Sequence, residues 1–111
     1  MRGVDLASIV GEQLVRPDEY ACRLVEGVAE HGDEIDAMLR KYSEHWALER
    51  MPVVDRTLLR MSTFELGWVS EVPAAAVITE AVELAKRYST KDSGRFVNGL
   101  LGRLAEQLRG T

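Results

Sequence analysis

A short stretch near the C-terminal end of the chain carries the side chains best suited to binding chemistry. Between residues 86 and 95 it holds four basic side chains and a single acidic one, which are Lys86, Arg87, Lys91, Arg95 and Asp92. Tyr88 and Phe96 add aromatic rings. Basic side chains and helix N-termini favour phosphate groups, and an aromatic ring can stack on an unpaired base. The stretch indicates a single-stranded RNA site, and an ordinary solvated junction between two helices explains its charges equally well.

Two helices must meet at this stretch to bring its side chains together. Residues 80–87 have apolar side chains at helical spacing, and Asp92 stands at the expected N-cap of a final helix that extends to about Leu108. We expect the Asp92 carboxylate to accept a backbone N–H there. Asn98-Gly99 lies inside this helix, where glycine costs about 1 kcal/mol relative to alanine. A packing reason or a functional reason is therefore expected for Gly99.

No catalytic or metal-binding arrangement of side chains accompanies the basic stretch. Ser89, Thr90 and Ser93 are interpreted as turn and capping residues rather than nucleophiles. The two histidines lie on different predicted segments, without acidic ligands at a suitable spacing. Cys22 is the only cysteine, which excludes an internal disulfide and a cysteine-based zinc site. We therefore expect a binding module rather than an enzyme, with no catalytic residue, metal or cofactor.

Length and composition place the chain among small globular proteins. It has 111 residues, of which 46% are hydrophobic and 29% charged, and a net charge of −4. Residues 1–50 hold 6 basic and 11 acidic residues, whereas residues 51–111 hold 8 basic and 7 acidic ones, so any nucleic-acid surface must be local. The sequence contains no signal peptide and no apolar run of about 18 residues, which predicts a cytoplasmic protein without membrane contact.

Apolar residues recur at helical spacing along most of the chain, with proline, glycine and capping residues between the segments. The predicted helices span about residues 5–14, 17–30, 33–42, 52–67, 73–87 and 92–108, with a short helical turn at 47–50. We expect one all-α domain over residues 1–111, built as an antiparallel bundle of about six helices. Arg60 and Glu65 are expected to lie along the apolar surface of their helix or to pair at its edge.

Several motifs follow one another in a fixed order and spacing. They are Val54-Asp55-Arg56, Leu59-Arg60-Met61, Phe64-Glu65-Leu66, Val72-Pro73, the block from Glu80 to Lys86, Asp92-Ser93, and the block from Phe96 to Leu101. Together they resemble the NusB family of bacterial transcription antitermination factors, over about residues 17–108. The resemblance implies an all-helical fold of two small bundles. It also implies binding of the boxA sequence of nascent RNA together with NusE, a small-subunit ribosomal protein. Together with the transcription elongation complex, these partners support processive transcription, chiefly of ribosomal RNA operons.

The resemblance also implies roles for individual residues. Asp92 and Phe96 match family positions at the RNA surface, although Phe96 could equally be a core residue because it lies at helical spacing with Leu100. Asp55 matches an acidic position that faces NusE, and Glu49 lies near the same surface. A homodimer is a further partner arrangement to test. The expected RNA-binding residues are Lys86, Lys91, Asp92, Arg95 and Phe96, and the expected partner-binding residues are Glu49 and Asp55.

The N-terminal region departs from the family pattern. NusB-like proteins begin with a helix that carries an arginine-rich motif, whereas residues 1–5 here look like the end of that helix and the loop after it. We expect the first family helix to be missing from this chain. The chain should then bind RNA more weakly than a full family member, and it should expose apolar surface where that helix would pack.

Two other functions are compatible with this fold. Ribosomal RNA cytosine methyltransferases of the Fmu type carry a NusB-like N-terminal domain, but their counterpart of Asn98-Gly99 tends to read Asn-Ala, so Gly99 favours NusB. The other alternative is a protein-binding helical domain without RNA binding. Measured RNA affinity distinguishes that alternative from an RNA-binding factor.

Overall fold

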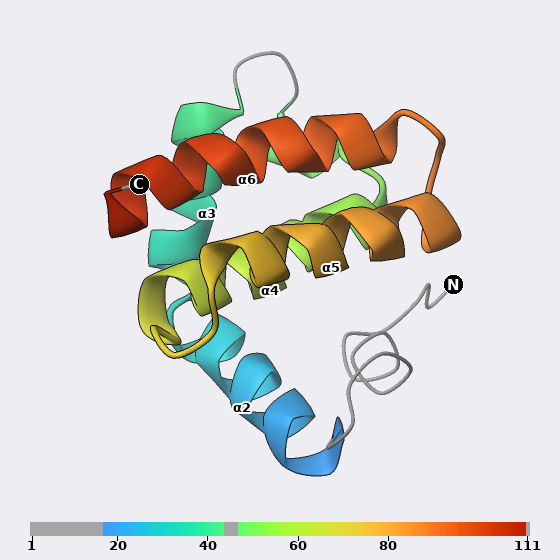
Figure 1. Ribbon diagram of the computed structural model, residues 1–111. Helices are drawn as coiled ribbons and strands as arrows, with labels where there is room; N and C mark the ends of the chain where they lie inside the picture. The colour runs from blue at the N-terminus through green and yellow to red at the C-terminus, as the bar shows by residue number, and fades with distance from the viewer. Residues whose placement is uncertain (1–16, 44–46, 111) are drawn as a thin grey trace.

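The computed structural model describes residues 17–43 and 47–110, which contain five α-helices and one short 3-10 helix and no strand. The elements, labelled as in Figure 1, are α2 (Pro17–Glu30), α3 (Gly32–Tyr42), η1 (Leu48–Arg50), α4 (Val53–Trp68), α5 (Ala74–Tyr88) and α6 (Ser93–Arg109). The predicted all-α class is confirmed, and the predicted helices agree with these bounds to within one or two residues. The predicted helix at residues 5–14 and the expectations for the N-terminus lie outside the described residues.

Each of the three prolines marks the start of a helix. Pro17 is the first residue of α2, and Pro52 and Pro73 directly precede α4 and α5. Pro52 and Pro73 have φ values of −55° and −62° with extended ψ values. Proline suits these positions because its ring fixes φ in this range and a helix start has no partner for the absent N–H.

Three long helices form the centre of the molecule. α5 and α6 lie side by side in opposite directions, and α4 packs against both (Figure 1). α2 and α3 pack on α4, and α3 also contacts α6. The turn that joins α5 to α6 lies at the end of the molecule opposite the C-terminal residue of α6 (Figure 1). Fully buried leucines fill the space between the elements, and they include Leu24, Leu39, Leu58, Leu59, Leu100, Leu101 and Leu104.

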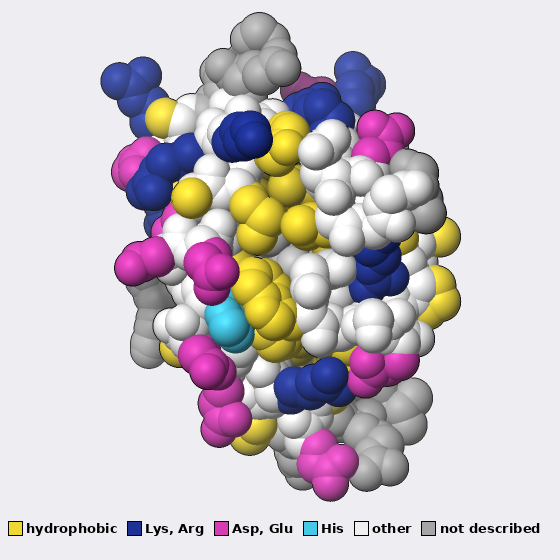
Figure 2. Space-filling view, turned by 90° about the vertical axis from the view of Figure 1, so that its left-hand side faces the viewer, with side chains coloured by type: hydrophobic (Ala, Val, Ile, Leu, Met, Phe, Trp, Pro, Cys, Tyr) yellow, Lys and Arg dark blue, Asp and Glu magenta, His cyan; other side chains and the backbone are white. Residues whose placement is uncertain are grey.

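α2 crosses α4 at a glycine. A Cβ atom added to Gly27 would lie only 2.1 Å from Cζ of Phe64, whose ring is buried. The Phe64 ring lies 5.6 Å from the Trp68 ring, and the His31 ring stacks on Trp68 at 4.4 Å between centroids. On the face shown in Figure 2, hydrophobic side chains form a strip beside the histidine, with acidic side chains along one edge. The absence of a side chain at Gly27 is what lets the two helices approach here.

The last residue of α6 caps the end of α4. The Arg109 guanidinium donates hydrogen bonds to the carbonyl oxygens of Glu65 and Leu66 at 3.0 Å and of Val69 at 2.9 Å. It also donates to the carbonyl oxygen of Val72. The final carbonyls of a helix have no partner within the helix and carry partial negative charge, so a cation is favoured there. Arg109 therefore joins the C-terminal ends of α4 and α6.

Glu65 lies on α4 between α2 and the Arg109 cap. The Tyr20 hydroxyl of α2 donates a hydrogen bond of 2.6 Å to Glu65 Oε2. Burial raises the pKa of the Glu65 carboxyl and the nearby Glu80 adds to this, while the Tyr20 hydrogen bond and the Arg109 charge act in the opposite direction. The ionised form of Glu65 is therefore less favourable in the folded chain than in the unfolded one.

The raised pKa predicts how stability depends on pH. The folded chain holds the Glu65 proton to a higher pH than the unfolded chain, so this residue lowers the free energy of unfolding as pH rises from the ordinary glutamate range through the raised pKa. Glu65→Gln keeps an acceptor for Tyr20 and removes the ionisation. Urea unfolding between about pH 4 and about pH 8 should show that the variant gains stability relative to the unmutated chain as pH rises.

Glu71→Gln is the matched control, because hydrogen bonds from the Glu71 backbone N–H and from Arg23 lower the pKa of the Glu71 carboxyl. This change should have the opposite sign, with stability lost relative to the unmutated chain at neutral pH rather than gained. Parallel pH profiles for the unmutated chain and the Glu65→Gln variant would contradict the assignment.

Candidate nucleic-acid interface

The turn between α5 and α6 gathers the residues predicted to bind RNA. Lys86 lies in the last turn of α5, Lys91 and Asp92 lie in the connecting turn, and Arg95 and Phe96 lie in the first turn of α6. The side chains of Lys86, Lys91, Asp92 and Arg95 are exposed. A helix N-terminus adds positive potential here. The structure gives these positions, and the contacts of these residues with RNA stay a prediction.

Lys86 is held close to the start of α6 by a glycine. A Cβ atom at Gly94 would lie 3.1 Å from Lys86 Cγ and 3.4 Å from Lys86 Cε, so the lysine stem runs over the Gly94 backbone. Gly94 is itself buried, and the Lys86 ammonium lies 3.9 Å from a Glu83 carboxylate oxygen, with the Lys86 side chain 61% exposed. Gly94 was not among the site residues predicted from the sequence. Its signal was a glycine in the first turn of a helix, where nothing local requires one.

Asp92 occupies the expected N-cap position but does not cap α6 with its side chain. Its backbone is already helical, with φ −81° and ψ −14°, and its carboxylate makes no capping hydrogen bond, so that prediction is wrong. The turn is closed by its neighbours instead. The Ser93 N–H donates to the Thr90 carbonyl at 3.1 Å, and the Thr90 N–H approaches Ser93 Oγ at 3.4 Å. The Asp92 carboxylate is exposed beside the turn.

Asp55, predicted to bind the protein partner NusE, is fully buried. Its exposed fraction is 0%, and its Oδ2 accepts a hydrogen bond of 2.8 Å from the Ser93 hydroxyl, which is 2% exposed. The hydroxyl oxygens of Ser89 and Thr90 lie 3.0 and 2.9 Å from Ser93 Oγ. A direct contact of this carboxylate with a partner is therefore not supported, because Asp55 points from the first turn of α4 into the base of the α5–α6 turn, and its role toward NusE stays a prediction.

Phe96 has features of both proposed roles. Its ring is partly buried and packs against the core, while part of its surface remains accessible. A ring that is fixed by packing and open on one side can stack a base without losing much conformational freedom. A change at Phe96 must therefore separate loss of stacking from loss of core packing.

The outer face of α6 leaves its backbone accessible beyond this turn. Asn98 and Gly99 are both exposed, and a Cβ atom at Gly99 would meet only Arg103 Nη1, at 3.9 Å. A Cβ at Gly102 would meet nothing within 4 Å. No packing reason for Gly99 exists among the described residues, and a functional reason stays a prediction.

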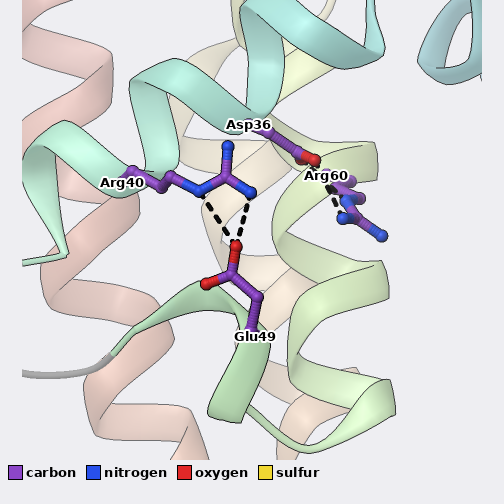
Figure 3. Close-up of polar contacts among 4 residues, drawn as sticks. All are labelled: Asp36, Arg40, Glu49 and Arg60. Atoms are coloured by element: carbon purple, nitrogen blue, oxygen red, sulfur yellow. Dashed lines mark hydrogen bonds and ion pairs between the residues drawn. The ribbon is translucent and has the colours of Figure 1, made fainter.

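The other predicted partner residue, Glu49, is exposed and paired. Glu49 Oε2 accepts hydrogen bonds from Arg40 of α3 at 2.6 and 3.2 Å, and its side chain is 64% exposed (Figure 3). The hydrogen bond from Arg40 lowers the pKa of the Glu49 carboxyl. Beside it, Arg60 of α4 pairs with both carboxylate oxygens of Asp36 at 2.8 and 2.9 Å (Figure 3). The prediction that Arg60 and Glu65 pair at the edge of α4 is confirmed. Arg60 pairs with Asp36 of α3, and Glu65 accepts a hydrogen bond from Tyr20 of α2.

Two further classes of site are absent from the described residues. In the ranges 17–43 and 47–110, no group of three or more histidine, cysteine or acidic side chains is placed to hold a metal ion. No helix in the same ranges has the length and apolar character needed to cross a membrane.

Comparison with known proteins gives one consistent family. The family model described as NusB family matches residues 10–106. The transcription antitermination protein NusB of Streptomyces avermitilis is 49% identical over 95% of this chain and 79% of its own length. The protein of the same name from Salinispora tropica is 54% identical over 82% of this chain and 68% of its own length.

Two solved structures share the fold. T. maritima NusB superposes with a TM-score of 0.79 at 42% identity, covering 93% of this chain and 76% of that one. A chain from the crystal structure of a plectonemic RNA supercoil superposes with a TM-score of 0.77 at 30% identity, covering 86% of this chain and 69% of that one.

Proposed function

Because this chain belongs to the NusB family, we propose that it acts in transcription antitermination by binding the boxA sequence of nascent RNA together with NusE. The relatives carry the name of transcription antitermination proteins, and one structural neighbour comes from a crystal that contains RNA. The observation that carries the proposal is the α5–α6 turn. It places exposed basic side chains and a partly exposed aromatic ring at a helix N-terminus.

Each residue of the turn has a distinct role in this proposal. Lys86, Lys91 and Arg95 neutralise phosphates, which is the main source of affinity and of salt dependence. Phe96 stacks on one unpaired base. The exposed Asp92 carboxylate, which is not used as a cap, accepts a hydrogen bond from the amino group of a base edge.

NusE is proposed to bind the surface around η1. Glu49 provides an exposed carboxylate there, already oriented by Arg40. Asp55, in the first turn of α4 after η1, contributes to this surface only indirectly, since its carboxylate is buried. In the cell the pair would act within the transcription elongation complex. A homodimer of this chain would appear in sedimentation analysis as a species that NusE or RNA displaces.

The proposal is tested at Phe96 with two substitutions. Phe96→Leu retains an apolar side chain for the core but has no aromatic face, so binding of single-stranded boxA RNA in the presence of NusE should weaken by about 1–3 kcal/mol. Its unfolding midpoint should change little, because volume-conserving apolar exchanges usually cost less than about 1.5 kcal/mol. Phe96→Ala should lose both affinity and stability.

Salt dependence gives an independent readout. Lys91→Ala and Arg95→Ala should each reduce the slope of log affinity against log salt by about one phosphate contact. Arg103→Ala is the control, since Arg103 lies two turns further along α6 and donates to the Tyr42 carbonyl instead. Undiminished RNA binding by the folded Phe96→Leu variant, with unchanged salt slopes for Lys91→Ala and Arg95→Ala, would reject RNA binding at this turn.

A further inference from the structure

The buried link between Asp55 and Ser93 connects two distant helix starts. Asp55 is the third residue of α4 and Ser93 the first residue of α6, 38 positions later in the chain. Their 2.8 Å hydrogen bond is buried, since the two residues are only 0% and 2% exposed. Sites separated by such a distance in sequence are brought into contact only by the complete packing of α4 against α6.

The local sequence explains why the Asp55 carboxylate turns inward. An acid at the third helical position commonly reaches back to the N–H of the N-cap residue, but the N-cap of α4 is Pro52, which has no N–H. The carboxylate instead lies where the starts of α4 and α6 meet, and both helix starts favour a negative charge. Oδ2 is satisfied by Ser93, whereas Oδ1 is buried and has no hydrogen-bond partner among residues 17–43 and 47–110.

A buried carboxylate with a single hydrogen bond is not expected to stabilise the fold more than apolar side chains would. Burying a carboxylate carries a desolvation cost that one hydrogen bond does not fully offset, and well-packed apolar groups are often at least as stabilising. What the hydrogen bond adds is direction. Unlike an apolar contact, it fixes the Ser93 hydroxyl at one point, and the same hydroxyl oxygen lies within 3.0 Å of the Ser89 and Thr90 hydroxyls.

We propose that Asp55 is a positioning residue for the RNA site, acting through the Ser93 hydroxyl to fix the α5–α6 turn. Ser93 adjoins Asp92 and precedes Phe96 by one helical turn, and Gly94 carries the contact with Lys86. Rotation or displacement of the first turn of α6 would therefore move Asp92, Phe96 and Lys86 together. This inference rests on the proposed RNA-binding function, and it assigns to Asp55 a role in shaping the RNA site.

The test compares variants that keep or remove the acceptor. Asp55→Asn keeps an oxygen that can accept from Ser93, whereas Asp55→Ala and Ser93→Ala each break the link. Affinity for a single-stranded boxA RNA oligonucleotide with NusE present is measured well below each unfolding midpoint, with the folded fraction checked by circular dichroism. We expect Asp55→Ala and Ser93→Ala each to weaken binding by about tenfold, because small displacements of binding groups are costly. Asp55→Asn should stay near the unmutated affinity.

Coupling separates positioning from a general loss of structure. If Asp55 acts through Ser93, the double variant Asp55→Ala/Ser93→Ala should bind no more weakly than either single variant. In a Phe96→Leu background, Asp55→Ala should also lose most of its effect, because the stacking ring that it positions is absent. A global loss of packing would produce neither result.

The outcomes are distinguishable from failure of the proposed function. An unmutated chain that shows no boxA binding with NusE would overturn the proposed function, and this inference with it. Binding by the unmutated chain, together with equal binding by folded Asp55→Ala, would overturn the inference alone. Multiplicative effects of Asp55→Ala and Ser93→Ala, or equal weakening by Asp55→Asn and Asp55→Ala, would also overturn it.

Discussion

Replacing Arg109 by alanine should lower the free energy of unfolding by about 3 kcal/mol, since hydrogen bonds to charged groups contribute about 1.5–3 kcal/mol each and are not additive. The guanidinium donates to the carbonyl oxygens of Glu65, Leu66, Val69 and Val72, all at the end of α4 or in the segment after it. Removing it takes a charged donor from all four carbonyls, although the Val69 and Val72 N–H groups still donate to Glu65 and Val69, and it removes the cation that the helix end favours. Equilibrium urea denaturation measures the loss directly.

Two further substitutions make the Arg109 result specific. Arg109→Lys retains the charge but has a single ammonium in place of the planar fork, so its stability should lie between those of the unmutated chain and Arg109→Ala. Arg103→Ala removes an exposed arginine that donates to one carbonyl, that of Tyr42, and should cost less than about 1 kcal/mol. Equal stability losses for Arg109→Ala and Arg103→Ala would show that the four-carbonyl cap stabilises the chain no more than a single exposed hydrogen bond does.

Gly27→Ala should also destabilise the chain strongly, although alanine is normally the better helix residue. The added Cβ would lie 2.1–2.6 Å from three atoms of the Phe64 ring, so the ring or one of the helices must move. Overpacking of this kind costs about 1–3 kcal/mol and occasionally more, which outweighs the gain of about 1 kcal/mol in helix propensity. The adjacent Trp68 ring, 5.6 Å away, restricts where the Phe64 ring can go. We expect a net loss of about 1–2 kcal/mol in the free energy of unfolding, measured by thermal unfolding.

Gly102→Ala is the matched control, because Gly102 lies inside α6 and an added Cβ there meets nothing within 4 Å. It should stabilise the chain by up to about 1 kcal/mol. A second control removes the obstacle: in a Phe64→Leu background, Gly27→Ala should lose most of its cost, giving a large coupling energy between the two sites. Similar stabilisation by Gly27→Ala and Gly102→Ala would disprove the steric account.

The helices could be predicted because their signals are local. Pro17, Pro52 and Pro73 mark three helix starts in the sequence, and apolar spacing marks the buried faces of the segments that follow. The approximate location of the candidate RNA site was also accessible. A cluster of basic residues around a helix junction remains a cluster however the rest of the chain folds.

The failures concern side chains whose partners lie far away in sequence. Aspartate is usually a surface residue, and only the packing of α4 against α6 shows that Asp55 is buried with Ser93 as its partner. Aspartate is a preferred N-cap residue, yet the hydrogen bonds that close the turn before α6 are made by Ser93 and Thr90 instead of the Asp92 side chain. Arg109 gave no sequence signal, because its acceptors are backbone carbonyls up to 44 positions earlier.

The Arg109 cap also has a consequence for the order in which the protein becomes stable during synthesis. The Leu66 carbonyl lies 43 positions before its donor, so a ribosome adding about 5–20 residues per second needs roughly 2–9 s between making the end of α4 and making its cap. During this interval the α4 segment has neither the donor for its C-terminal carbonyls nor α6 to cover its apolar face, and a single helix of this length is only marginally stable alone. The nascent bundle should therefore gain protection from proteases in one late step, when the last turn of α6 docks, rather than helix by helix.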